Sequence, residues 1–122
     1  MYKYFSKNDT KIQCRCGCGK GLDDMDQEFM HRLDAAREQA GVPFRITSGF
    51  RCGKHNNKVS STGFNGPHTT GKAIDIRAHS PRNRYLVLKA LIDQGFHRLG
   101  VARTFIHVDA TDNDPEVIWN YD

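Results

Sequence analysis

The sequence predicts an α+β fold, with a small antiparallel sheet and helices packed on one side of it. Two amphipathic helical stretches and a set of short strands occur as separate groups and do not alternate regularly along the chain, which is typical of this class. The length of 122 residues suits one domain with one modest core. We therefore expect a single domain over residues 1–122, in which residues 1–21 form a polar, cysteine-rich N-terminal arm.

The first helix is expected directly after this arm. Apolar residues recur there at the spacing of one helix face, at Leu22, Met25, Phe29, Leu33 and Ala36. Asp24 and Gln27 match a capping box at the start of the helix. Gly41, with Pro43 just beyond it, predicts the end.

The middle of the chain is expected to hold two strands and a long loop. Residues 44–47 predict a short strand that leads into the run Ser-Gly-Phe-Arg at 48–51. Residues 52–70 are rich in Gly, Asn, Ser and Thr and predict a loop, and long structured loops in small domains are often functional. Residues 72–77 predict the second strand.

The second half of the chain predicts one more helix and two more strands. Ser80 followed by Pro81 matches a helix start. The buried side of this helix is marked by Tyr85, Leu88, Leu91 and Ile92, and Gly95 predicts its end. Residues 98–102 and 104–109 predict two strands joined by a tight turn. For the tail, residues 115–122, we expect a turn of helix that packs Ile118 and Trp119.

Composition and charge exclude several classes of protein. A hydrophobic share of 38% and a charged share of 26% are those of a soluble globular protein, and no stretch approaches the roughly 18 apolar residues that cross a bilayer. Residues 1–7 do not resemble a secretory signal, so we expect a chain that is cytoplasmic at synthesis and reaches any outer target after release or by another export route. The net charge of +4 is spread along the chain without a Lys/Arg run, which argues against a nucleic-acid binder. We expect a monomer.

His68, Asp75 and His107 are the candidate metal ligands. Side chains alternate between the two faces of a strand, so Asp75 and His107 would point away from the isoleucines and valine beside them and toward a shared polar face. His68 ends the preceding loop and can fold over that face, with Gly71 giving the turn its freedom. Two imidazoles and one carboxylate leave one position of a zinc ion open, as catalytic sites require. A buried His–Asp hydrogen bond would produce the same pattern.

Three blocks of the sequence resemble a known family. They are Ser48-Gly49-Phe50-Arg51, His68-x-x-Gly71-x-Ala73-x-Asp75 and His107-x-Asp109. In this order they resemble the zinc D-Ala-D-Ala carboxypeptidase family, which includes phage endolysins that cut the L-Ala–D-Glu bond and which shares its fold with the hedgehog signalling domain. The resemblance covers roughly residues 22–110. It implies a fold of this type and a Zn²⁺ cofactor bound by His68, Asp75 and His107.

The resemblance also implies roles for residues beside the metal. Arg51 would contact substrate and stabilise developing negative charge, with Ser48 of the same block as a further substrate contact; the alternative for Arg51 is an ion pair with a loop carboxylate. Members of the family carry a Glu or Asp as general base three residues before the last histidine, where this chain has Thr104. Asp109 is the nearest replacement. It would act as the base, hold His107 in position, or simply cap the strand end.

The implied function is a zinc-dependent peptidase that hydrolyses amide bonds in peptidoglycan stem peptides. A D-Ala-D-Ala carboxypeptidase and an endolysin-type endopeptidase both fit, as do a phage lysis role and a bacterial wall-remodelling role. Thr104 fits the alternative, a non-catalytic zinc-containing module that binds peptidoglycan. His55 and His97 are further candidates for the base, without a pattern that favours either.

The four cysteines form a second group, at Cys14, Cys16, Cys18 and Cys52. Three thiols within five residues, with Cys52 as a fourth ligand, could bind a structural zinc. A disulfide between Cys52 and one of the three, or free thiols, are the other interpretations, and a reducing compartment at synthesis disfavours the disulfide. A structural zinc or a disulfide would each hold the N-terminal arm beside Arg51.

Overall fold

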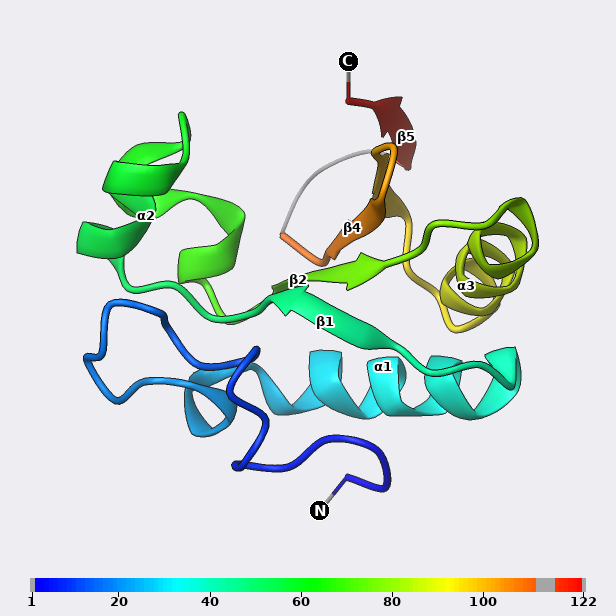
Figure 1. The fold of residues 1–122 in the computed structure, drawn as a ribbon, viewed down its shortest axis with the longest axis horizontal. Helices are drawn as coiled ribbons and strands as arrows, with labels where there is room; N and C mark the ends of the chain where they lie inside the picture. The colour runs from blue at the N-terminus through cyan, green and yellow to red at the C-terminus, as the bar shows by residue number, and fades with distance from the viewer. Residues whose placement is uncertain (1, 112–115, 122) are drawn as a thin grey trace.

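One five-stranded sheet organises the part of the chain that the computed structural model describes, residues 2–111 and 116–121. Its spatial order is β1-β2-β4-β3-β5 (Figure 1). The strands are β1 (Arg45–Ser48), β2 (Ala73–Arg77), β3 (Arg98–Val101), β4 (Phe105–Asp109) and β5 (Val117–Asn120). Strands β1 to β4 pair antiparallel, whereas β5 runs parallel to β3. The predicted α+β class is confirmed, with one parallel pair added at the edge of the sheet.

Two longer helices cover one face of this sheet. The helices are α1 (Gln27–Ala40), α2 (Gly53–Val59) and α3 (Pro81–Asp93). Figure 1 shows α1 and α3 on the same side of the strands, while α2 lies apart from both, beyond the end of β1. Apolar residues of α1, α3 and the inner sheet face form the core, among them Phe29, Leu33, Leu91, Ile74, Ile76, Ile106 and Val108. No helix among the described residues has the length and apolar content needed to span a membrane.

Helix α1 confirms the predicted helix but begins later than the capping pattern indicated. The N-cap is Asp26, whose carboxylate accepts a hydrogen bond of 2.9 Å from the N–H of Phe29. Asp24 instead belongs to a 3-10 turn, Leu22–Asp24, and accepts from the N–H of Gly21. The backbone N–H of Asp26 donates to Gly71 at 2.8 Å, and this contact with a distant segment separates the turn from the helix.

The segment 52–70 is not the irregular loop that its composition predicted. It contains α2 and two 3-10 turns, Gly63–Asn65 and Pro67–Thr69. The segment is held by a polar side chain: Asn56 is fully buried, and its amide donates to Thr62 Oγ1 at 2.8 Å and to the carbonyl of Gly63. Helical periodicity of apolar residues could not reveal a helix that a buried amide stabilises.

The tail forms an edge strand, so the predicted turn of helix is wrong; Pro115 and Asp122, at the ends of that prediction, lie outside the described residues. Ile118 is 60% exposed and does not pack as expected. The side chains of Trp119 and Tyr121 lie against Gly100 of β3, where a Cβ would come within 2.7 Å of both rings. Pairing with β3 is a long-range interaction that overrides local preference.

The N-terminal arm packs against the loop that leaves β1. Phe5, Ile12 and Cys14 are buried in the core. The carbonyl of Ile12 accepts a hydrogen bond of 2.8 Å from the N–H of Phe50. A Cβ on Gly49 would lie 2.6 Å from the Cα of Ile12, so this close approach requires glycine.

Gly71, which leads into β2, offers a test of this packing. Its φ is +76°, and a Cβ there would lie 2.5 Å from the carbonyl oxygen of Asp24. Gly41 has a similar φ of +71° but open space around it. We expect Gly41→Ala to lower the free energy of unfolding by about 1 kcal/mol through backbone strain alone, and Gly71→Ala by a further ~1–3 kcal/mol through the collision. Urea unfolding of both variants measures the difference, and equal losses would contradict this account.

Candidate metal centre

Two neighbouring strands place the predicted ligands on the polar face of the sheet. Asp75 of β2 is the direct partner of His107 on β4. His68 comes from the 3-10 turn Pro67–Thr69 that precedes β2. All three side chains are buried, and one ligand atom from each lies within 4.8 Å of the others. The structure therefore brings together the three residues that the sequence singled out.

The distances between ligand atoms suit a small divalent cation. His68 Nε2 lies 3.4 Å from Asp75 Oδ2, and His107 Nδ1 lies 2.9 Å from Asp75 Oδ1. Tetrahedral zinc with ligands at about 2.1 Å would separate neighbouring ligand atoms by about 3.4 Å. Two nitrogens and one oxygen also form the donor set of catalytic zinc sites that keep a position open. These residues therefore fit the metal.

Backbone contacts fix the orientation of His68. Its Nδ1 lies 2.8 Å from the carbonyl oxygen of Gly49, to which a protonated Nδ1 donates. A His68 ring protonated on Nδ1 alone has Nε2, 3.4 Å from Asp75 Oδ2, available as a neutral metal ligand. The N–H of Arg51 donates back to the carbonyl of His68 at 3.1 Å. The loop after β1 and the turn before β2 are thus held as a pair.

Asp109 lies behind His107 and does not face the open side of the cluster. Its Oδ2 lies 2.7 Å from His107 Nε2, and its Oδ1 accepts from Arg98 Nε at 2.7 Å and from the Thr111 hydroxyl at 3.1 Å. The Asp109 side chain has no exposed surface. Among the roles expected for Asp109, these contacts support holding His107, with its Nδ1 presented beside Asp75.

Burial and ion pairing act in opposite directions on these groups. Burial alone raises the pKa of Asp75 and of Asp109, but hydrogen bonds outweigh it: those from His107 and His68 hold the Asp75 pKa well below its usual range, and those from His107 and Arg98 hold the Asp109 pKa at about 2. Burial lowers the pKa of His107, yet its bonds to Asp109 and Asp75 raise the pKa to about 9. Without a metal, these two bonds therefore favour the imidazolium form of His107, between two carboxylates.

Arg51 lies beside the cluster at the cleft. Its guanidinium donates to Asn56 Oδ1 at 3.1 Å, and another of its nitrogens lies 4.0 Å from Asp75 Oδ2. The buried Asn56 therefore positions Arg51, whose side chain keeps 19% of its surface exposed. This geometry leaves donors for a ligand in the cleft.

The cluster forms the floor of a cleft of about 430 Å³. Several residues that line it were not expected from the sequence, among them Arg98, Trp119 and Tyr121. The Trp119 ring lies 5.6 Å from the His107 ring, and the guanidinium of Arg98 lies 5.3 Å from the Trp119 ring. An aromatic residue in a tail predicted to be helical gave no local sign of this placement, because β5 reaches the cleft only through its pairing with β3.

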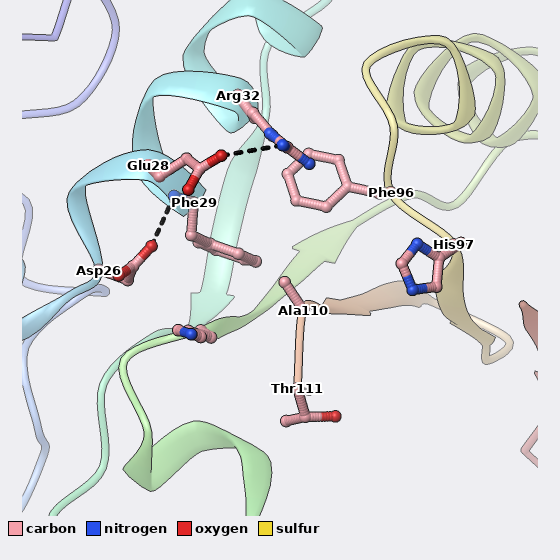
Figure 2. A pocket seen from close by; sticks show the side chains of 9 residues that line it. Asp26, Glu28, Phe29, Arg32, Phe96, His97, Ala110 and Thr111 are labelled. Atoms are coloured by element: carbon pink, nitrogen blue, oxygen red, sulfur yellow. Dashed lines mark hydrogen bonds and ion pairs between the residues drawn. The ribbon is translucent and has the colours of Figure 1, made fainter. Parts of the chain in front are cut away.

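Other residues considered from the sequence lie outside the described lining of this cleft. Ser48 and His55 line an adjoining hollow that shares Arg51 with it, and Thr104 is exposed in the turn before β4. His97 lies in a separate pocket between α1 and the start of β3 (Figure 2). The geometry therefore gives no support to His55 or His97 as a base at the cluster.

A buried cluster of two histidines and a carboxylate, open to a cleft on an α+β scaffold, is typical of the class of metal-dependent hydrolases. Comparison with known families refines this class. The family model described as Peptidase M15 matches residues 3–109, so the chain belongs to the peptidase M15 family and is a metallopeptidase by family. Comparison with curated proteins and with solved structures gave no match.

The raised pKa of His107 predicts how the stability of the metal-free protein depends on pH. The ion pairs of His107 stabilise the fold fully below the ordinary pKa of 6.5, and this contribution is lost as the pH rises toward about 9. In chelator, we expect the free energy of unfolding to fall over this range by on the order of 3 kcal/mol, since one pKa unit corresponds to about 1.4 kcal/mol. Urea titrations at several pH values measure it. His107→Asn should remove this part of the decline, and parallel profiles for the two proteins would refute the ion pairs.

Proposed function

We propose that this protein is a zinc peptidase that hydrolyses amide bonds in peptidoglycan stem peptides, with His68, Asp75 and His107 as the zinc ligands. The observation that carries the proposal is the convergence of these three buried side chains at the floor of a cleft, in a chain of the peptidase M15 family. The stem peptide is supported by the sequence resemblance to D-Ala-D-Ala carboxypeptidases and endolysins. We propose that the protein acts as a monomer.

A bound zinc ion supplies a water of lowered pKa and polarises the scissile carbonyl. The residues of the chain prepare this chemistry. Asp75 contributes the negative charge of the ligand set, and its low pKa keeps it ionised at neutral pH. His68 presents Nε2 because its Nδ1 is bound to the carbonyl of Gly49.

Arg51 acts on the substrate in this proposal. Its guanidinium faces the cleft, is held by Asn56, and approaches Asp75 only to 4.0 Å. Fixed guanidinium donors suit a substrate carboxylate or the oxyanion that forms during amide hydrolysis. Ser48, on the other side of Arg51, contributes to the adjoining hollow, where a longer stem peptide would extend.

Asp109 is a positioning residue in this proposal. Its carboxylate accepts a hydrogen bond from the N–H at Nε2 of His107, so that Nδ1 is available to the metal. The same carboxylate pairs with Arg98, which leaves it poorly placed to accept a proton from a water in the cleft. In this proposal Asp109 is therefore not the general base that the sequence predicts at this position.

A peptidoglycan-binding module without hydrolysis is the second candidate. The observation that favours it concerns the cleft: among the described lining residues the only carboxylates are Asp75 and Asp109, and both are engaged by histidines. Thr104, at the position where the family places its base, lies exposed in a turn. Release of peptides from the wall distinguishes the two candidates.

The test compares wild-type protein with His68→Ala on purified cell wall. We expect the wild type to release stem-peptide fragments, and the variant to lose both this activity, by about 10³-fold or more, and the metal bound at the cluster. Mass spectrometry of the fragments also shows which bond is cut. His79→Ala removes an exposed histidine outside the cleft and should behave as wild type. Wall binding without any released fragment in the wild type would select the binding module, and full activity of His68→Ala would refute both the metal and the proposal.

Replacement of Asp109 separates positioning from proton transfer. We expect Asp109→Asn to weaken zinc binding by about 10–100-fold, as loss of a hydrogen-bond partner of a metal-bound histidine does. Competition with a chromogenic chelator measures the affinity, and Asp93→Asn, at an exposed ion pair on α3, is the control. An unchanged zinc affinity with strongly reduced turnover would instead assign Asp109 to proton transfer.

A further inference from the structure

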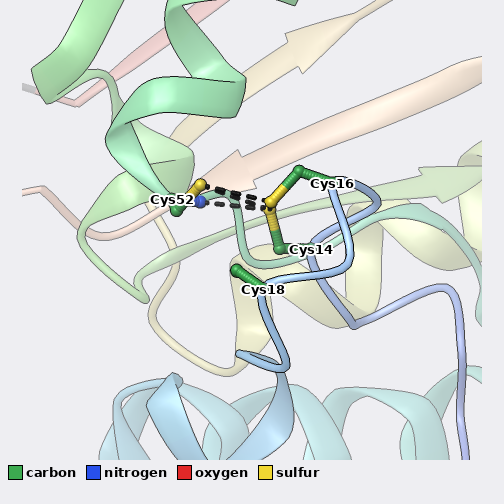
Figure 3. A group of neighbouring side chains, drawn as sticks. All are labelled: Cys14, Cys16, Cys18 and Cys52. Carbon is green, nitrogen blue, oxygen red and sulfur yellow. Dashed lines mark hydrogen bonds between the residues drawn. The ribbon is translucent and has the colours of Figure 1, made fainter.

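A second group of ligand-bearing side chains lies outside the cleft, where the arm meets α2. Cys14, Cys16 and Cys18 come from the arm, and Cys52 precedes α2 (Figure 3). One sulfur atom from each lies within 4.8 Å of all the others. The proposed catalytic function does not use these residues.

The separations of the sulfur atoms match a metal site better than a disulfide. Sγ of Cys14 lies 3.4 Å from that of Cys16 and 3.7 Å from that of Cys52, and the Cys16 and Cys52 sulfurs lie 3.5 Å apart. Tetrahedral zinc with Zn–S bonds of about 2.3 Å would separate its sulfurs by about 3.8 Å. A disulfide would bring one pair of sulfur atoms to about 2.0 Å. It would not explain why the other two sulfur atoms also lie within the cluster.

The backbone of the arm is shaped to bring alternate cysteines to one point. In an extended chain, the Cα atoms of residues i and i+2 lie about 6.6 Å apart. Here Gly17 and Gly19 have φ of +84° and +87°, which turns the chain between and after the cysteines. The N–H of Cys14 donates to the carbonyl of Lys20 at 2.8 Å and closes this turn.

Backbone N–H groups and basic side chains lie beside part of this cysteine cluster. The backbone N–H of Cys52 points to Cys14 Sγ at 3.3 Å, and that of His55 points to Cys52 Sγ at 3.4 Å. Lys54, His55 and Lys58 line the hollow beside the cluster. Four thiolates around a divalent ion carry a net charge of about −2, and these neighbours offset it.

We propose that Cys14, Cys16, Cys18 and Cys52 bind a second zinc ion as a closed, four-sulfur structural site. Binding releases the thiol protons and joins two segments whose nearest cysteines, Cys18 and Cys52, are 34 residues apart. Cys52 directly follows Arg51, and its carbonyl accepts from the N–H of Asn56 at 2.9 Å. The site therefore fastens the arm to the residues that hold Arg51 at the cleft.

Metal analysis and cobalt spectroscopy of the full chain test this site separately from the catalytic one. Protein purified with reductant and dialysed against a weak chelator should hold about two zinc ions per chain. Cobalt substitution should give the strong near-ultraviolet thiolate-to-cobalt absorption that nitrogen and oxygen ligands do not produce. The paired variant Cys16→Ser/Cys18→Ser, at the two exposed cysteines, should lose that absorption and one ion. His68→Ala/His107→Ala should lose the other ion and keep the absorption.

Each other outcome decides the question. Cobalt-loaded wild type without thiolate absorption, or a mass that shows a disulfide after purification with reductant, overturns the second site even if the cysteine variant does not fold. Four thiols that react at once in the native wild type and are not slowed by zinc overturn it too. A peptidase that proves inactive but keeps the thiolate absorption leaves this site intact and refutes only the proposed function.

Discussion

The pairing of β2 with β4 is the constraint on which the site depends. Antiparallel register sets Asp75 opposite His107, and strand alternation sends both away from the isoleucines and valine that fill the core. A shift of one residue in either strand would bury the ligands in the core and expose the apolar side chains. One strand register thus places the core residues on the inner face of the sheet and the ligands on the other face. The packing of α1 and α3 on the inner face therefore also specifies where the ligands meet.

The buried carboxylates and histidines of the ligand cluster each require a hydrogen-bonding or charged partner. Each carboxylate oxygen at the cluster has a nitrogen or hydroxyl beside it, and the described part of the chain leaves no buried polar side-chain atom without a partner. Because a buried charge without a partner is costly, the network holds its members in one arrangement. The resulting rigidity is what a metal needs from its ligands: His107 is fixed from behind by Asp109, and His68 by the carbonyl of Gly49.

The sequence predicted those parts of the fold in which local pattern and tertiary role agree. The periodicity of Phe29 and Leu33 revealed α1, and the alternation around Asp75 and His107 revealed β2, β4 and the meeting of the ligands. Predictions from the sequence were wrong where contacts between distant segments determine the structure. Asp26 replaces Asp24 as the cap because its N–H is bound to Gly71, and α2 depends on the buried amide of Asn56. Trp119 enters the cleft wall only through the parallel pairing of β5 with β3. None of these contacts has a local periodic pattern.

The absence of a side chain at Gly100, a glycine, has a consequence for how substitutions can alter the cleft. Because Gly100 of β3 has no Cβ, the rings of Trp119 and Tyr121 pack directly over it. They form the cleft wall at the edge of the sheet opposite β1. The width and polarity of that wall are therefore set by an edge strand that contributes nothing to the ligand cluster. Substitutions in β5 can change which substrates fit the cleft while the ion-binding residues stay the same. Substrate recognition and metal chemistry therefore depend on different strands of this fold.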